Sequence, residues 1–206
     1  MNEFKRIEAS KASIGHRKSV YGKGTNDADY IVQPIGEDGK RTCCPYYQKW
    51  YEMLRRCYSP AWLKKYPTYM GCTVCKEWLR FTVFRRWLEK ENWQGNDLDK
   101  DIILIGNKVY APSYCCLPTH RENSLLNDCG AARGRYPQGV HFHKQRGTFE
   151  AQCMVNGKKK FLGYFDSCHR AEAHYQNFKR DLIIATAMAS SDERIKNGLL
   201  RHADFL

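Results

Sequence analysis

Two aspartates, Asp99 and Asp101, stand one residue apart in the stretch "LDKDIILIGNKVYAP", with Lys100 between them. Carboxylate oxygens are the ligands that Mg²⁺ and Mn²⁺ prefer, so the pair is a candidate site for a divalent cation. A metal-dependent nuclease needs a proton acceptor here, usually a histidine. A lysine with a pKa of about 10 is protonated at neutral pH, and the adjacent aspartates favour its charged form. The stretch fits either a nuclease site or a structural ion cluster.

The net charge of the 206-residue chain is +12, and it is unevenly distributed. Residues 45–90 and residues 131–180 each carry +7, whereas residues 91–130 between them carry −3. Basic blocks attract phosphate by releasing counterions, and the acidic block could bind a divalent cation. A solvated surface would account for either basic block alone, but two such blocks in one small chain favour a nucleic-acid-binding protein.

The composition excludes several classes of protein. With 42% hydrophobic residues the chain can bury a core. It has no run of 18 apolar residues, so we expect no membrane-spanning segment. The first residues lack the apolar stretch of a secretory signal, so we expect the ten cysteines to be reduced and mostly buried.

The first half of the chain predicts helices and a β-turn-β-helix segment. Apolar spacing and Pro45 predict a helix over about 45–58, and a second helix is predicted over 76–91. Two short strands, about 98–104 and 108–110, would turn at Gly106–Asn107. A helix would then run from Pro118 to a point before Gly130. Residues 1–44 predict a hairpin around Gly36–Gly39.

The second half changes to alternating hydrophobicity. Three strands are predicted in "GVHFH", "TFEAQCMV" and "KKFLGYF", with turns at Arg146–Gly147 and Asn156–Gly157. Asp166 or Ser167 would cap a long helix, whose inner face is predicted to hold Ala171, His174, Tyr175, Phe178, Leu182 and Ala185. The last 16 residues predict either one more short helix or a tail.

One face of the predicted sheet is polar and rimmed by cations. Strand alternation places Phe149, Ala151, Cys153 and Val155 toward the helix, and Glu150, Gln152 and Met154 on the other side, flanked by His141 and His143. Lys144, Arg146, Lys158, Lys159 and Lys160 lie at the turns. Such a surface can enter the major groove of duplex DNA while its cations contact phosphate.

Residues 136–180 resemble the DNA-binding domain of plant ethylene-response factors, the APETALA type. The strand start "GV", the motif "A-x-C" in the middle strand, "LGYF" and "A-E-A-x-Y" occur in the order typical of that family. The resemblance implies that the exposed sheet face reads the groove. By position, His141, His143, Glu150 and Gln152 would face the bases, and Arg133, Arg135, Lys144 and Arg146 would lie near phosphates. The family favours arginines where this chain has His141 and His143, which implies weak site specificity.

Residues 45–180 as a whole resemble HNH-type homing endonucleases carried by phages. The resemblance rests on Trp50, Met53, Arg56-Cys57-Tyr58, Val74-Cys75-Lys76-Glu77-Trp78, Asp99, Asp101, Gly106-Asn107, Tyr110, Pro112 and Asn123. It implies Mg²⁺ or Mn²⁺ held by Asp99 or Asp101 together with Asn123 or His120. Lys100 stands where the catalytic histidine is expected, so His120 would have to substitute as the base. The resemblance also implies a location in the cytoplasm of a bacterial host.

The pair Cys72 and Cys75 is half of a tetrahedral zinc site. Cys57 is a candidate third ligand, but the second C-x-x-C motif that such a site needs does not follow. Buried thiols without metal are the other interpretation.

Together these features predict an α+β protein with an HNH-like ββα core, flanking helices and a three-stranded antiparallel sheet packed on one helix. The predicted boundaries are a 1–44 extension, a 45–130 HNH-like domain, a 131–188 APETALA-type domain and a 189–206 tail. The expected function is binding of double-stranded DNA and its metal-dependent cleavage. The alternative is a non-cleaving DNA-binding regulator or a phage protein that binds a host factor. A third interpretation is RNA binding through stacking on Tyr46, Tyr47 and Trp93.

Overall fold

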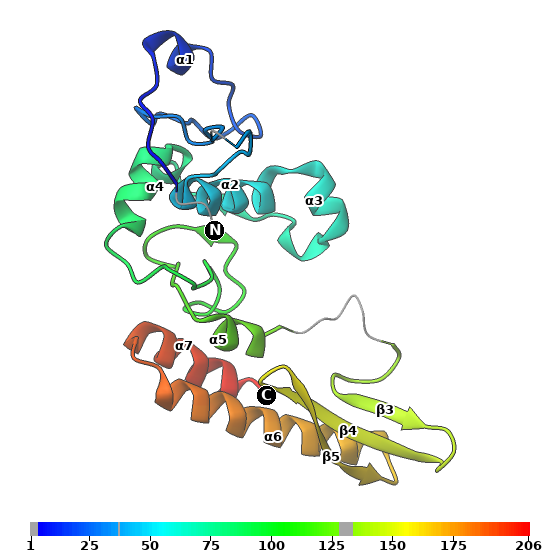
Figure 1. The fold of residues 1–206 in the computed structure, drawn as a ribbon. Helices are drawn as coiled ribbons and strands as arrows, with labels where there is room; N and C mark the ends of the chain where they lie inside the picture. Colours follow the sequence, from blue (N-terminus) through cyan, green and yellow to red (C-terminus); the bar gives the residue numbers. More distant parts are fainter. Residues whose placement is uncertain (1–3, 37, 128–133) are drawn as a thin grey trace. The chain divides into compact units, whose positions relative to one another are not determined.

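The computed structural model describes residues 4–36, 38–127 and 134–206. It confirms the α+β class (Figure 1). The chain divides into two compact units, residues 1–117 and residues 118–206. The helix that follows Pro118 therefore belongs to the second unit. The predicted domain boundaries placed this helix in the 45–130 domain.

Helices are the main regular elements of the first unit, and two short strands form a small sheet. Its helices are α1 (Lys11–Gly15), α2 (Pro45–Tyr58), α3 (Pro60–Lys65) and α4 (Phe81–Leu88), with short 3-10 helices η1 (Pro67–Tyr69) and η2 (Glu77–Leu79). Strands β1 (Thr73–Val74) and β2 (Val109–Tyr110) pair in parallel. Helix α2 begins at Pro45, as predicted, because proline suits a first turn that needs no N–H donor.

The core of the first unit is built on α2. Its residues Trp50, Met53 and Leu54 are fully buried, and the indole N–H of Trp50 donates to the carbonyl oxygen of Trp78 at 2.7 Å. The N-terminal segment contributes buried Tyr30 to the same core. Residues 1–44 are thus an integral part of this unit rather than a separate extension.

The predicted hairpin at Gly36–Gly39 is present. Ile35 and Arg41 form an antiparallel bridge, and the N–H of Gly36 donates to the carbonyl oxygen of Lys40 at 2.8 Å. Glu37, inside this turn, lies outside the described residues.

The predicted strand pair 98–104 and 108–110 is wrong. Oδ1 of Asp99 accepts hydrogen bonds from the backbone N–H groups of Asp101 and Ile102, which folds the chain into a turn instead of a strand. Asp99 pairs with Cys116 in an antiparallel bridge with two backbone hydrogen bonds of 3.0 and 3.1 Å. The segment that pairs with Asp99 is therefore the one around Cys116. The predicted partner strand, 108–110, contains β2, which pairs with β1 instead.

The second unit is a sheet packed on a helix, as predicted. It contains α5 (His120–Leu125), β3 (Val140–His143), β4 (Thr148–Val155), β5 (Lys158–Phe165), α6 (Cys168–Ala189) and α7 (Glu193–Asp204). The antiparallel strands have the order β3-β4-β5, and α6 runs along one face of them (Figure 1). The β4–β5 turn has Asn156 at φ 51° and Gly157 at φ 75°, as expected of a two-residue Asn-Gly hairpin.

Helix α7 accounts for most of the last 16 residues, which fits the predicted short helix rather than a tail. Asp192 caps it by accepting hydrogen bonds from the N–H groups of Arg194 and Ile195. Helix α6 packs against both the sheet and α7. Its buried residues are Ala171, Tyr175, Lys179, Ile183, Thr186 and Ala187, whereas His174 and Ala185, predicted to lie inside, are exposed.

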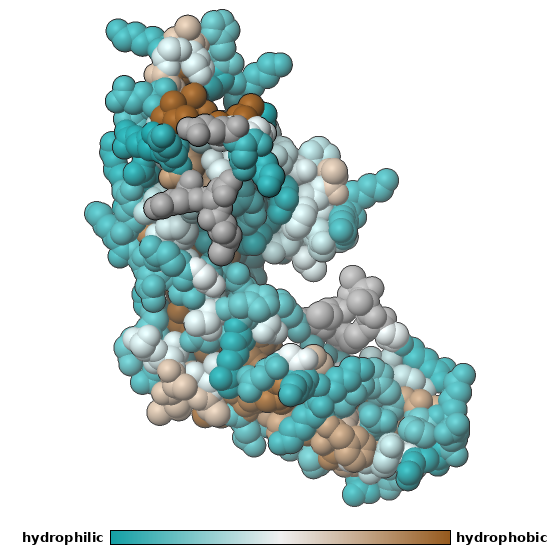
Figure 2. Space-filling model, viewed as in Figure 1, coloured by the Kyte–Doolittle hydropathy of each residue, from teal (hydrophilic) through white to brown (hydrophobic). Residues whose placement is uncertain are grey.

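The face of the protein drawn in Figure 2 is mostly polar. Figure 2 shows hydrophilic side chains over most of the visible face. Among the described residues, no helix has the length and apolar character needed to span a membrane.

Candidate nucleic-acid interface and metal site

Asp99 and Asp101 form a pair of neighbouring carboxyl groups in the first unit. Burial raises the pKa of Asp99 to about 7, and the negative charge of Asp101 adds to this effect. The hydrogen bonds that Asp99 accepts from the backbone act in the opposite direction. A carboxyl group such as that of Asp99, whose pKa is raised by burial and by a neighbouring carboxylate, is the kind of group that a divalent cation keeps charged.

Lys100 is buried beside this pair. Its Nζ donates to Oδ2 of Asp101 at 2.9 Å and lies 6.0 and 5.9 Å from the ring centroids of Tyr69 and Tyr110. Burial lowers the pKa of Lys100, but the carboxylate of Asp101 outweighs that effect and leaves the pKa raised. A lysine held charged in this way cannot accept a proton from water, so Lys100 does not fit the role of catalytic base.

The other predicted catalytic residues, His120 and Asn123, lie on α5. Thr119 and Glu122 form a reciprocal capping box that fixes the start of this helix. His120 is exposed and Asn123 is half-buried. Both belong to the second unit, whereas Asp99 and Asp101 belong to the first. A joint catalytic site of these four residues therefore remains a prediction.

The carboxylate oxygens of Asp99 and Asp101 suit a hard divalent cation, but they supply only some of the ligands that it needs. Oδ1 of Asp99 is already used by two backbone N–H groups, and Asp101 is half-exposed. Within the described ranges, three or more His, Cys, Asp or Glu side chains do not come together as a metal site. Mg²⁺ ordinarily completes its coordination with water and substrate phosphate oxygens, so two carboxylates are sufficient protein ligands.

The zinc site of Cys72 and Cys75 stays a prediction. Burial raises the pKa of both thiols, and it raises the pKa of the candidate third ligand Cys57 to about 12. A tetrahedral site needs four ligands, and in the part of the chain that the structure describes they do not gather.

The strand register determines which residues lie on the open face of the sheet, the face opposite α6. Directly opposed residues of neighbouring strands share a face. The rows of this open face are His143–Thr148, His141–Glu150–Tyr164, Gln152–Phe161 and Met154–Lys159. The other face, with Val140, Ala151 and Cys153, is buried. All four predicted base-facing residues thus share the open face.

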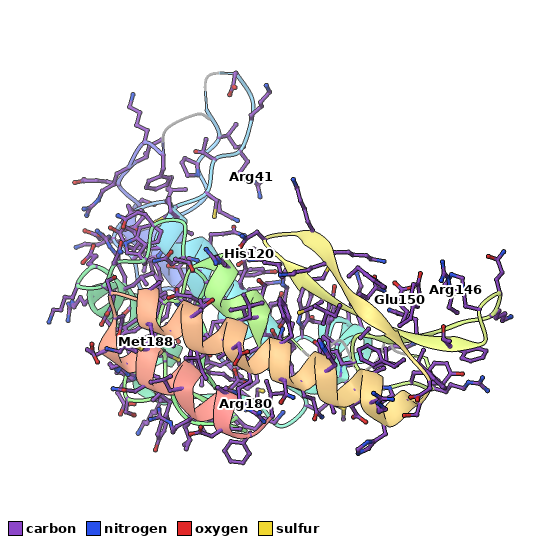
Figure 3. The ribbon with its side chains drawn as sticks, turned by 90° about the horizontal axis from the view of Figure 1, so that it is seen from below. Arg41, His120, Arg146, Glu150, Arg180 and Met188 are labelled. Carbon is purple, nitrogen blue, oxygen red and sulfur yellow. The ribbon has the colours of Figure 1, made fainter. Side chains whose placement is uncertain are left out.

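The cations of this region divide between the two faces. Arg146, at the tip of the β3–β4 hairpin (Figure 3), lies over the Tyr164 ring at 4.6 Å from its centroid. Lys159 shares the open face with Met154. Lys160 instead lies over the ring of Phe178 on α6, and Lys158 is paired with Val155 on that same side. Lys158 and Lys160, predicted to contact DNA from the turn, therefore lie on the α6 side, because strand alternation separates adjacent lysines.

Two further predicted phosphate contacts are exposed. Lys144 lies in the β3–β4 turn, and Arg135 donates to the hydroxyl of Tyr136 at 2.6 Å. Arg133 lies outside the described residues.

Sequence reasoning missed two aromatic residues of the open face. Phe161 is 53% exposed and Tyr164 is 41% exposed, with their ring centroids 4.9 Å apart. Strict alternation would place residues three apart on opposite faces. Ala151 pairs with Gly163 and Gln152 with Phe161, so Leu162 is an extra residue in β5 and both rings face outward. Gly163, at φ 140°, is the local signal for this bulge.

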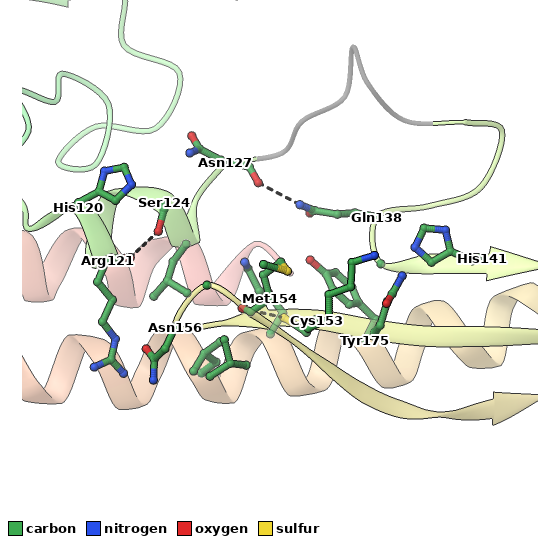
Figure 4. A pocket seen from close by; sticks show the side chains of 18 residues that line it. His120, Arg121, Ser124, Asn127, Gln138, His141, Cys153, Met154, Asn156 and Tyr175 are labelled. Atoms are coloured by element: carbon green, nitrogen blue, oxygen red, sulfur yellow. Dashed lines mark hydrogen bonds between the residues drawn. The ribbon is translucent and has the colours of Figure 1, made fainter.

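A cavity of about 870 Å³ lies in the second unit between α5, α6 and the sheet. His120, His141 and Gln152 line it together, as does the buried Lys179. Figure 4 shows His120 and Arg121 on α5, and the hydrogen bond from Gln138 to the carbonyl oxygen of Asn127. One predicted catalytic residue and two predicted base-facing residues thus line the same cavity, with His120 and His141 at opposite ends of it in Figure 4.

The aromatic residues considered for RNA stacking are engaged within the first unit. The rings of Tyr46 and Trp93 have centroids 4.7 Å apart, and Tyr47 is buried against Trp50 and Phe81. Their positions do not favour stacking on unpaired bases.

Comparison with protein-family models, with curated proteins and with solved structures finds no match for this chain.

Proposed function

We propose that the protein binds double-stranded DNA with the open face of the β3–β4–β5 sheet. The observation that carries the proposal is the shared face of His141, Glu150, Gln152 and Arg146, whose opposite side is buried on α6. The major groove admits β-strands, and the donors and acceptors of such side chains match base edges.

Each group has a role in this proposal. Gln152 and the two histidines offer hydrogen bonds to base edges, and Glu150 can accept from the amino group of cytosine. Arg146 and Lys159 contact phosphates. Tyr164 holds the guanidinium of Arg146 over its ring, which restricts Arg146 before binding.

The test compares two double variants that lose the same charge. Arg146→Ala with Lys159→Ala removes cations of the open face, and Lys158→Ala with Lys160→Ala removes cations of the α6 side. Fluorescence anisotropy with a labelled duplex should show at least a tenfold loss of affinity for the first variant only, from two phosphate contacts of about 0.7 kcal/mol or more each. Equal losses for both variants would mean that DNA is attracted only by the overall positive charge of the protein, and the assignment to the open face would be wrong.

We further propose that the protein is an HNH-like endonuclease that uses Mg²⁺ or Mn²⁺. The buried carboxyl of Asp99 beside that of Asp101 supports this proposal. A bound cation would polarise the scissile phosphate and stabilise the leaving oxygen. Asp99 and Asp101 would hold it, while His120 and Asn123, on α5 of the second unit, stay separate candidates for the proton acceptor and a further ligand. The DNA would lie in the cytoplasm of a bacterial host.

Asp99→Asn is the most informative variant for this second proposal. Asparagine keeps the side-chain oxygen that accepts from Asp101 and Ile102, so the turn is retained while the carboxylate is lost. Supercoiled plasmid incubated with Mg²⁺ or Mn²⁺ should be nicked by the wild type and left intact by Asp99→Asn and by His120→Ala. Failure of the wild type to nick in either metal would favour the alternative proposal, a non-cleaving DNA-binding regulator or a protein that binds a host factor.

A further inference from the structure

Helices α2 and α3 of the first unit carry a connected set of cations and aromatic rings. We name Arg55, Trp62, Lys64, Lys65 and Tyr66 the α2–α3 cation cluster. The guanidinium carbon of Arg55 lies 4.2 Å from the centroid of the Trp62 ring, the rings of Trp62 and Tyr66 are 4.3 Å apart, and Nζ of Lys65 lies 5.2 Å from the centroid of Tyr66. Because each contact limits the rotamers of a long side chain, the cations are positioned before any ligand binds.

The positive charge of the cluster is not compensated locally. Residues 53–76 contain five Lys and Arg residues and no Asp or Glu. Lys64 and Lys65 are exposed in the last turn of α3. Among residues 4–36, 38–127 and 134–206, neither these lysines nor Arg55 form an ion pair.

Two donors of the cluster lack an acceptor. Nε of Arg55 and Nε1 of Trp62 are both shielded from solvent and have no hydrogen-bond partner among the described residues. Shielded polar atoms are normally paired, so an external oxygen acceptor would satisfy a donor that the protein leaves unused. A small rotation of the Arg55 guanidinium toward solvent would present its N–H groups to such an acceptor.

We infer that the α2–α3 cation cluster binds the phosphate backbone of duplex DNA, as a second contact surface apart from the sheet. This inference rests on the proposed DNA-binding function. The ligand is phosphate rather than an unpaired base because Trp62 already contacts Arg55 and Tyr66 and is not free for stacking. A guanidinium matches two phosphate oxygens in a fixed geometry, and the two lysines add point charges beside it.

The first test is a chemical footprint on the full chain. Lysines are acetylated with a small N-hydroxysuccinimide ester in the presence and absence of a duplex, and the modified sites are read by mass spectrometry. Lys64 and Lys65 should be protected severalfold by the duplex, while exposed Lys23 and Lys90 of the same unit should not. Protection that is absent, or equally strong with polyglutamate, would overturn the inference and indicate no site or an unselective anion surface.

The second test uses matched variants. Lys64→Ala with Lys65→Ala should lower the magnitude of the slope of log K against log salt by about 1 for each lysine, equally on two unrelated duplexes. Lys23→Ala with Lys90→Ala, which loses the same charge, should leave the slope unchanged. An unchanged slope for the first pair would overturn the inference.

The outcomes for the two surfaces are separable. If only the variant of Arg146 and Lys159 loses duplex affinity, the sheet proposal stands and the cluster fails. If only the variant of Lys64 and Lys65 loses it, DNA binding stands and the assignment to the sheet fails.

Discussion

Lys100 and Asp101 form an ion pair whose members differ sharply in exposure. The side chain of Lys100 is 7% exposed and that of Asp101 is 44% exposed, with Nζ 2.9 Å from Oδ2. The buried ammonium depends on the carboxylate for its charge, whereas the carboxylate retains water if the lysine is removed. This asymmetry decides how substitutions in the candidate metal site must be interpreted.

Asp101→Ala should destabilise the fold, whereas Lys100→Met should not. Removal of Asp101 leaves the buried positive charge of Lys100 without the carboxylate that it contacts at 2.9 Å. We expect this loss to cost about 1–3 kcal/mol of the free energy of unfolding. Methionine fills the volume of Lys100 without a charge, so the change should stay within about 1 kcal/mol. Urea denaturation at pH 7 measures both. A larger loss for Lys100→Met than for Asp101→Ala would contradict this account of the pair.

Duplex binding should weaken steeply as salt increases. Each phosphate contact contributes about 0.9 to the magnitude of the slope of log K against log salt. With Arg146 and Lys159 both on phosphates, their double alanine variant should lower that magnitude by about 1.8. The measurement is anisotropy from about 50 to about 200 mM salt. A flat dependence for the wild type would contradict the role assigned to the basic segments.

Asp27 caps α4 from a distant segment, and its removal should cost stability in a pH-dependent way. It accepts hydrogen bonds from the N–H and hydroxyl of Thr82 and forms an ion pair with Arg80. Burial acts to raise the pKa of Asp27, but the bonds from Thr82 and Arg80 outweigh it and lower the pKa below 3.8. Asp27→Ala should cost about 1 kcal/mol at neutral pH, as for other lost caps.

The sign of the pH effect follows from the lowered pKa. The contribution of Asp27 is present above the unfolded pKa near 3.8 and is lost as the pH falls through the folded pKa. The difference in unfolding free energy between wild type and Asp27→Ala should therefore shrink in acid. The exposed Asp29 provides a control, since Asp29→Ala loses the same charge and should have little effect at any pH. A difference for Asp27→Ala that stays constant down to acid would argue against a charged cap.

Gly139→Ala should disrupt the start of β3. Gly139 has φ +77°, and a Cβ there would lie 2.2 Å from Cδ2 of Tyr175 and 2.7 Å from the carbonyl oxygen of Gln152. Gly157→Ala, with φ +75° and no neighbour within 4 Å, isolates the backbone strain alone, about 1 kcal/mol. Thermal or urea unfolding should show a clearly larger loss for Gly139→Ala. Equal losses would mean that α6 does not constrain β3 here.

Local chemistry determined several elements from the sequence alone. Pro45 and the spacing of Trp50, Met53 and Leu54 predicted α2, because the helical period brings these residues to one face. The Asn156–Gly157 pair predicted the β4–β5 turn, because few other residues adopt a positive φ at low cost. The charges beside Lys100 likewise predicted a protonated lysine.

Tertiary contacts decided the rest. Asp99 pairs with Cys116 after its own side chain has accepted hydrogen bonds from two backbone N–H groups and turned the chain. The spacing of hydrophobic residues does not predict this pairing. The bulge at Leu162, which turns Phe161 and Tyr164 outward together, comes from the register between β4 and β5. The burial of residues on α6 depends on α7 as well as on the sheet, because both pack against this helix. The sequence by itself thus determined which helices and turns form and where charge gathers, since those depend on neighbours along the chain. Only the tertiary structure decided which segments pair and which side chains of different segments come into contact, since that depends on residues brought together by folding.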